Sequence, residues 1–201
     1  MGAAEFFLLA HSRSHSGRLV GVEALDVSFY EDRALHGLTE AQMRMRPHDL
    51  NSIAWILWHI ARTEDFGANL LVAGRPQVLD EEDWPRHLGV ARRDIGTGMT
   101  AEEVAEIGDR LDIEAAREYR LVVGRRTREI VGTLRPEDWD AAIDEARVQR
   151  AFDAGALLPG ATWPRPWFTG KSVAWVLSWP CLGHNNMHLG QAMWVKRLVR
   201  R

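Results

Sequence analysis

Two histidines near the C-terminus stand four residues apart, in the stretch HNNMH at residues 184–188. Residues at positions i and i+4 of an α-helix lie on one face, about 6 Å apart along the axis. Two imidazoles placed in this way can bind one metal ion at roughly 2.0–2.1 Å each. The alternative interpretation is that His184 and His188 only share a helix face, and the pair by itself does not separate the two.

A third histidine, His59, lies in the middle of the most apolar segment of the chain, AWILWHIARTE. A third imidazole from a facing helix would complete a metal site and leave coordination positions open for water or substrate. The alternative is a core histidine bonded to a backbone carbonyl or a carboxylate. Met187, Met193 and Trp194 make the helix of the C-terminal pair apolar as well, and this favours the metal, because buried histidines need partners.

Several neighbouring side chains are candidates for supporting roles. Gln191 follows His188 by three residues and could orient a ligand, and Asn185 lies between the paired histidines. Trp55, one helical turn before the third histidine, is a candidate pocket residue. Cys181 is either a thiolate ligand or, as is usual for a free cysteine, a small buried hydrophobe.

The remaining histidines and two acidic residues are predicted to lie at the surface. Glu64 and Asp65 follow His59 by five and six residues and are not on its helical face, so we expect a surface pair. Five further histidines fall in termini, turns or loops and are expected to be exposed: His11, His15, His36, His48 and His87.

Residues 135–170 carry four prolines and three glycines and are expected to form a long loop. Loops of this length are often functional. Its aromatic stretch TWPRPWF either forms a lid over the metal, with Trp163, Trp167 or Phe168 as walls, or simply packs on the rest of the protein. Nine tryptophans in the chain would fit an aromatic pocket.

Apolar periodicity predicts helices and no strand. Four substantial helices are expected over residues 17–35, 51–73, 112–134 and 172–199, and shorter ones over 38–47 and 100–110. Pro180 should kink or split the last helix. The sequence therefore predicts an all-α bundle of four helices with long connections.

Composition and charge limit the number of domains and the class of protein. The chain has 201 residues, 46% of them hydrophobic, and a net charge of −3. This indicates one globular domain, with residues 1–16 as an N-terminal extension, and does not favour a nucleic-acid binder. A single cysteine, a poor signal peptide and no stretch long enough to span a bilayer predict a cytoplasmic protein. No GxSxG, P-loop or GxGxxG motif is present.

The text NSIAWILWHIARTEDF, followed more than a hundred residues later by HNNMHLGQ, resembles the DinB-like superfamily over about residues 17–200. The resemblance implies a four-helix bundle of up-down-down-up order with His59, His184 and His188 as metal ligands. HIARTEDF also resembles the DinB-like domain of ergothioneine-pathway sulfoxide synthases. The chain lacks the large second domain of those enzymes, and this argues against that activity.

The resemblance implies one divalent transition metal, zinc, nickel or iron, and a thiol transferase or isomerase. Such enzymes use a small-molecule thiol such as mycothiol, bacillithiol or glutathione against an electrophile, and related bundles often form homodimers. The alternative is a non-catalytic metal-binding or stress-response bundle. A helical interaction domain without metal is a third hypothesis, and it requires His59 to lie far from the C-terminal pair.

Overall fold

The computed structural model describes residues 1–158, 160 and 164–200. Among them no β-strand forms, and one isolated bridge joins Ala142 to Ser172. The predicted all-α fold is confirmed. The principal helices are α1 (Ala3–Ser14), α2 (Tyr30–Leu35), α4 (Ile53–Asp65), α7 (Ile113–Thr133), α10 (Val173–Ser178) and α11 (His184–Val199).

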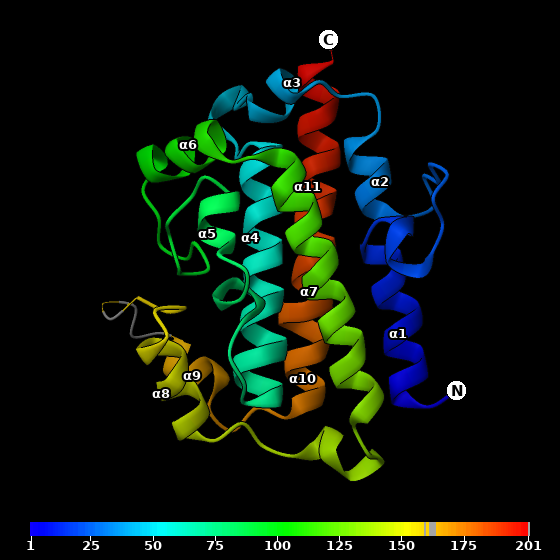
Figure 1. Ribbon diagram of the computed structural model, residues 1–201, viewed down its shortest axis with the longest axis vertical. Coiled ribbons are helices and arrows are strands. Elements are labelled where there is room, and N and C mark those ends of the chain that lie inside the picture. Colours follow the sequence, from blue (N-terminus) through cyan, green and yellow to red (C-terminus); the bar gives the residue numbers. More distant parts are fainter. Residues whose placement is uncertain (159, 161–163, 201) are drawn as a thin grey trace.

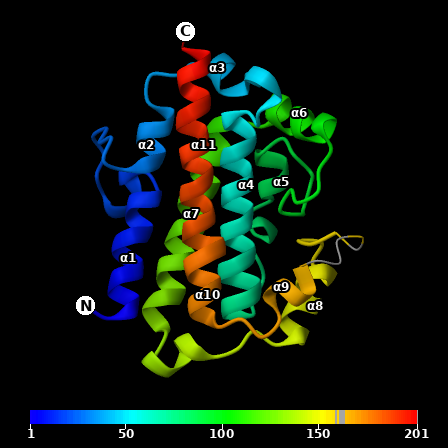
Figure 2. The same ribbon diagram turned by 180° about the vertical axis from the view of Figure 1, so that it is seen from behind.

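These helices form four parallel columns (Figure 1). The first column, α1 with α2, rises from the N-terminus; α4 and α7 both descend; and α10 with α11 rises to the C-terminus. The bundle therefore has the predicted up-down-down-up order. Seen from behind, α11 lies between α2 and α4 and packs against both of them (Figure 2).

Helix α4 forms the centre of the bundle, and every one of its residues is buried. Its capping residue, Ser52, accepts a hydrogen bond from the backbone N–H of Trp55. Gly108 of α6 (Ala101–Arg110) faces this cap so closely that a Cβ there would lie 2.6 Å from the Ser52 hydroxyl. Trp58 of α4 and Tyr119 of α7 are among the largest fully buried side chains of the core.

Both helices that carry the candidate ligands contain a π-helical segment. Helix α4 continues as η3 (Phe66–Ala73), and α10 reaches α11 through η6 (Trp179–Gly183). Pro180 lies within η6; because proline cannot donate to the helical ladder and clashes with the preceding turn, the wider turn accommodates it. Gly67 lets the two segments touch, since a Cβ there would lie 2.9 Å from the Cys181 sulfur.

The predicted helix over residues 17–35 is confirmed only in its last part, α2 (Tyr30–Leu35), and is wrong before it. Residues Gly17–Val20 form only a short 3₁₀ turn, η1, which ends at Gly21 with a φ of 78°. The side chain of Asp26 then accepts from the backbone N–H of Ser28, a local turn that competes with helix. The first long helix is α1, which lies in the region predicted to be an extension and buries Phe7 against the bundle.

The segment 135–170 is more helical than predicted. It contains η5 (Pro136–Asp140), α8 (Glu145–Asp153) and α9 (Pro164–Phe168). Asp144 caps α8 by accepting from the backbone N–H of Arg147, and Val148 and Ala151 bury one face of that helix. Helix α8 packs on η3, at the lower end of the second column.

The two shorter predicted helices are confirmed as α3 (Glu40–Arg44) and α6, each with a capping box, at Thr39 and Thr100 respectively. Remaining short elements are η2 (Pro47–Asp49), η4 (Val78–Asp80) and α5 (Trp84–His87). Within the described part of the chain, none of the helices combines the length and apolar character needed to cross a membrane.

Candidate metal centre

The fold brings His59 of α4 together with His184 and His188 of α11. Nε2 of His59 lies 3.1 Å from Nε2 of His184, and one ring nitrogen from each of the three histidines lies within 4.8 Å of the others. Two ligands of a tetrahedral ion at 2.0–2.1 Å lie about 3.4 Å apart, which is close to this spacing. The interaction domain without metal required a distant His59, and the structure does not meet that condition.

Hydrogen bonds fix the tautomers of two of these imidazoles. Nδ1 of His59 donates to the carbonyl of Ile95 at 2.5 Å, and Nδ1 of His188 donates to the side-chain oxygen of Gln191 at 2.9 Å. Because each ring uses its one proton in this way, its Nε2 carries a lone pair. The Nε2 atoms of His59 and His188 are therefore available to bind a cation.

Glycine at position 96 makes the carbonyl contact to His59 possible. Gly96 has a φ of 82°, and a Cβ there would lie 2.7 Å from the ring of Trp58. Its N–H donates to the side chain of Asp94, which closes the turn that aims the Ile95 carbonyl at the histidine. The sequence DIGTG is the signal for this turn, although its partner is set by the tertiary fold.

Burial keeps all three imidazoles neutral. It lowers the pKa of His59 well below its usual value, and His184 and His188 lower it further. The pKa of His184 falls to about 4 through burial and the proximity of His188, and burial also lowers that of His188. Metal binding requires deprotonated ligands, so these surroundings supply three imidazoles in the required state at neutral pH.

The predicted supporting residues lie in different places. Trp55 stacks on His59 with ring centroids 4.4 Å apart, and Gln191 contacts His188. Asn185 points away, toward Glu64 and the Cys181 carbonyl. Trp163 lies outside the described residues.

A cavity of about 240 Å³ opens beside the three histidines and includes Trp167, the remaining predicted pocket residue. Two of the histidines form part of its wall, and aromatic and aliphatic side chains form most of the rest. Its lining is His59, Thr63, Ile95, Thr97, Trp167, Phe168, Trp179, Pro180 and His184. Trp167 and Phe168 come from the segment predicted to be either a lid or a packing loop. Ile95, Thr97 and Trp179 were not predicted, because nothing in the local sequence links them to the histidines.

The predictions for His11, His15 and Glu64 are wrong. All three are fully buried and meet in a second cluster between α1 and α4, where Nε2 of His11 lies 2.7 Å and Nε2 of His15 3.0 Å from the two Glu64 carboxylate oxygens. The three remaining histidines of that group, His36, His48 and His87, are exposed as predicted. Helix α1 explains the error, because it packs over the face of α4 that carries Glu64 and buries that residue together with His11 and His15.

The carboxylate of Glu64 is surrounded by protein donors. Besides both histidines, Thr127 donates at 2.9 Å and Asn185 at 2.8 Å, and the Arg120 guanidinium lies 3.6 Å away. Burial opposes ionisation of Glu64, but its charged and hydrogen-bonding neighbours hold the pKa of the carboxyl well below its usual value. Burial and the charge of Arg120 lower the pKa of His15 to about 3.

This second cluster also offers two imidazoles and a carboxylate within 4.8 Å of one another. Its donor set differs from the first, because each histidine presents an N–H, not a lone pair, to an acceptor that already has further donors. A dication there would also face the permanent charge of Arg120. We therefore assign this cluster a structural role.

Asp65 and Cys181 are buried in other contacts. Asp65, predicted at the surface, accepts from Tyr119 at 2.5 Å and from the backbone of Val78 and Leu79, and it pairs with Arg62. The Cys181 sulfur lies 3.8 Å from the Glu64 carbonyl, and burial together with the charges of Glu64 and Asp65 raises the pKa of its thiol well above the usual value. Cys181 therefore fits the small buried hydrophobe better than a thiolate ligand.

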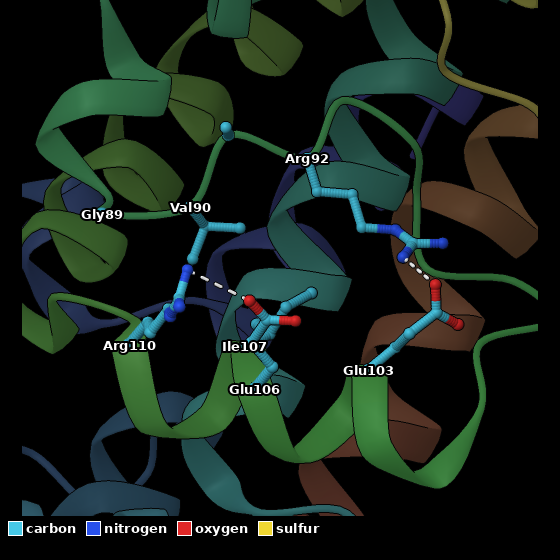
Figure 3. A pocket seen from close by; sticks show the side chains of 8 residues that line it. Gly89, Val90, Arg92, Glu103, Glu106, Ile107 and Arg110 are labelled. Carbon is cyan, nitrogen blue, oxygen red and sulfur yellow. Dashed lines mark hydrogen bonds and ion pairs between the residues drawn. The ribbon is translucent and has the colours of Figure 1, made fainter.

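A larger cavity, of about 290 Å³, lies between the 89–92 loop and α6 and contains none of the three clustered histidines (Figure 3). Its arginines are already paired, Arg92 with Glu103 at 2.5 Å and Arg110 with Glu106 at 3.1 Å. The two cavities therefore differ in character: the larger one is lined by ion pairs, and the smaller one is apolar and includes imidazole nitrogens.

A sequence model of the DinB superfamily matches residues 32–192. This span includes α4, α7 and both histidines of α11, and it leaves α1 outside. No curated protein shows a significant sequence match to the chain.

Proposed function

Since the chain belongs to the DinB superfamily, we propose that it binds one divalent transition metal through His59, His184 and His188 and acts as a metal-dependent thiol transferase or isomerase. Zinc, nickel and ferrous iron all suit three imidazoles. The observation that carries the metal site is the convergence of neutral imidazoles whose Nδ1 protons are bonded to Ile95 and Gln191.

The residues around the three histidines would have distinct roles in the metal site. Ile95 and Gln191 hold two of the ligand rings in orientation, as outer partners of metal-bound histidines do. Trp55 packs flat against His59 and limits its rotation. A bound dication with three neutral ligands would keep its charge and favour the thiolate form of a thiol cosubstrate.

The open cavity favours an enzyme over a purely structural metal site. A structural zinc site has four protein ligands, and beside this triad the described residues provide a cavity in place of a fourth histidine, cysteine or carboxylate. A non-catalytic metal-binding bundle is the alternative function. It would bind the same metal but would not transfer a thiol to any electrophile.

Elemental analysis of protein purified without an affinity tag tests the metal site directly. We expect about one equivalent of a transition metal in the wild type and its loss in His184→Ala. A His11→Ala variant is the matched control, because His11 belongs to a pair of the same four-residue spacing in the second cluster, that of His11, His15 and Glu64. No metal in the wild type, even after reconstitution with zinc, nickel and ferrous iron, would contradict the proposal.

Thiol transfer is tested next, with the reconstituted protein, mycothiol, bacillithiol or glutathione, and electrophiles of graded size. Metal-dependent consumption of a thiol supports the enzyme, and its absence with all three thiols favours the non-catalytic bundle.

We also propose a cytoplasmic homodimer. Exposed Met187 and Trp194, seven residues apart on α11, are the apolar side chains that such a contact would cover. Light scattering in solution would measure the assembly.

A further inference from the structure

We propose that the cavity beside the histidines takes a small aromatic ligand, with its ring among Trp167, Phe168 and Trp179. A single metal-binding donor atom of the ligand, such as a thiol sulfur, is directed at His59 and His184. This inference rests on the proposed function for the role of the donor atom, but its aromatic part rests on the cavity alone.

The walls of the cavity are suited to a ring. Phe168 packs edge-on against Phe66 and Trp175, with ring centroids 5.2 and 5.9 Å away, and it is almost fully buried. Trp179 stands edge-on to His184 at 6.5 Å, and Gly183 leaves room for it, since a Cβ there would lie 3.1 Å from its ring. Aromatic rings favour such edge and offset contacts with one another.

No lysine, arginine, aspartate or glutamate is among the described residues that line the cavity. The nearby cations are engaged elsewhere. Arg165 of α9 bonds Gln149 and lies over the ring of Phe152, and Lys171 lies over Trp175. A multiply charged ligand would therefore lose its hydration without gaining partners.

The polar atoms of the cavity can hold only a small head group. The Thr63 hydroxyl already donates to the His59 carbonyl at 2.8 Å, and the Ile95 carbonyl accepts from His59. The imidazoles, the Thr97 hydroxyl and the indole N–H of Trp179 are among the polar groups that the lining offers a ligand. A polyhydroxylated thiol would thus place its sulfur here and leave its polar body at the mouth of the cavity.

The volume fixes the size of the ligand. A dry apolar cavity of about 150 Å³ holds a benzene molecule. The cavity beside the histidines has about 240 Å³, enough for one ring with a short substituent or for a small bicyclic compound, and too small for a large polar conjugate.

Ligand-observed ¹⁹F NMR on the metal-free full-length protein tests the aromatic part. The probes are 4-fluorobenzyl alcohol and 3-fluoropropan-1-ol, which share a hydroxyl head and differ in the ring. We expect the aromatic probe to bind at least about tenfold more tightly, because ring burial removes apolar surface from water. Thr97→Trp should fill the cavity and remove this preference, and Ala91→Trp, in the cavity of Figure 3, should leave it unchanged. Equal affinity for both probes, or a preference that survives Thr97→Trp, would overturn the inference.

Zinc-loaded protein tests the direction of the donor atom. Calorimetric titration with phenylmethanethiol should show at least about tenfold tighter binding than to metal-free protein, whereas 2-mercaptoethanesulfonate should bind more weakly than phenylmethanethiol in both. Tightening for neither thiol would overturn the orientation. The failures are distinguishable: if zinc does not bind, the proposed function fails and the ¹⁹F result still decides the aromatic site, and if zinc binds without a ring preference, only the inference fails.

Discussion

His11 on α1 and His15, the residue directly after that helix, have the same four-residue spacing as His184 and His188 on α11, yet the two pairs have opposite surroundings. His11 and His15 donate to Glu64, inside a cluster that Thr127, Asn185 and Arg120 complete. The pair on α11 meets a third imidazole, whose proton is bonded elsewhere, beside an open cavity. Histidine spacing therefore does not distinguish a ligand set from a structural network. What distinguishes them is whether the ring nitrogens present protons or lone pairs.

The largest expected effect is on stability, from Glu64→Ala. The substitution removes the acceptor of both His11 and His15 and leaves Arg120 with Glu31 as its one acidic partner among the described residues. Breaking a buried charge network in this way costs about 3–5 kcal/mol. Urea unfolding of the metal-free protein measures it. His184→Ala is the comparison and should change the free energy of unfolding by about 1 kcal/mol or less. Similar losses in both variants would mean that the two clusters do not differ in role.

Metal affinity should show the reverse order. Loss of a ligand's outer partner costs about 10–100-fold in affinity, and His184→Ala, which removes a ligand itself, should cost at least as much. His11→Ala should leave zinc affinity within about threefold of the wild type, since its ring donates to Glu64 and presents no lone pair there. Competition with a chromogenic zinc chelator measures both. Zinc loss in His11→Ala, in protein shown to be folded, would contradict the structural role assigned to the second cluster.

The third effect is the response of the metal-free protein to acid. An unfolded histidine has a pKa near 6.5, whereas those of His15 and His184 are about 3 and about 4 in the fold. Between 6.5 and about 4 the unfolded chain binds protons that the folded chain does not. The free energy of unfolding therefore falls as the pH falls, by up to about 1.4 kcal/mol per pH unit for each such histidine.

Unfolding titrations at several pH values in this window measure that slope. His15→Gln and His184→Gln should each reduce it by about one histidine's share, because each removes one group whose pKa is depressed. A slope unchanged in His15→Gln would mean that this ring is protonated in the folded protein, contrary to the burial and the Arg120 charge around it.

The smallest expected effect comes from Gln191→Ala. It removes the acceptor of the His188 Nδ1 proton and should weaken zinc binding by about tenfold. Gln191→Glu retains an acceptor and should restore the affinity, a rescue that a merely structural contact would not show. Neither substitution should alter the free energy of unfolding as Glu64→Ala does.

Much of the fold could be predicted from local sequence. The apolar helix α4, the short α6 and the long periodic α7 are present as predicted. The predicted helix over residues 17–35 forms only at Tyr30–Leu35, because Gly21 and Asp26 favour turns that apolar periodicity does not detect. Helix α8 was missed because it is short and its buried face contacts η3, far away in the chain.

The candidate site was predictable in its histidines and not in its surroundings. A histidine inside an apolar helix and a spaced pair in another are signals that a single sequence carries. The Ile95 carbonyl and the Trp179 wall come from separate segments and carry no local mark. The same limit produced the errors at His11, His15 and Glu64, because burial of a terminal helix depends on what it packs against.

The sequence by itself determined the residue types, the helical spacing that places His184 and His188 on one face, and the apolar helix that holds His59. Those follow from covalent order and from the 3.6-residue period of the helix. Only the tertiary structure decided which histidine pair meets an imidazole and which meets a carboxylate. The physical reason is that Glu64, the Ile95 carbonyl and the facing imidazole reach these ring nitrogens from segments distant in sequence. Those partners decide which nitrogen of a ring carries its proton.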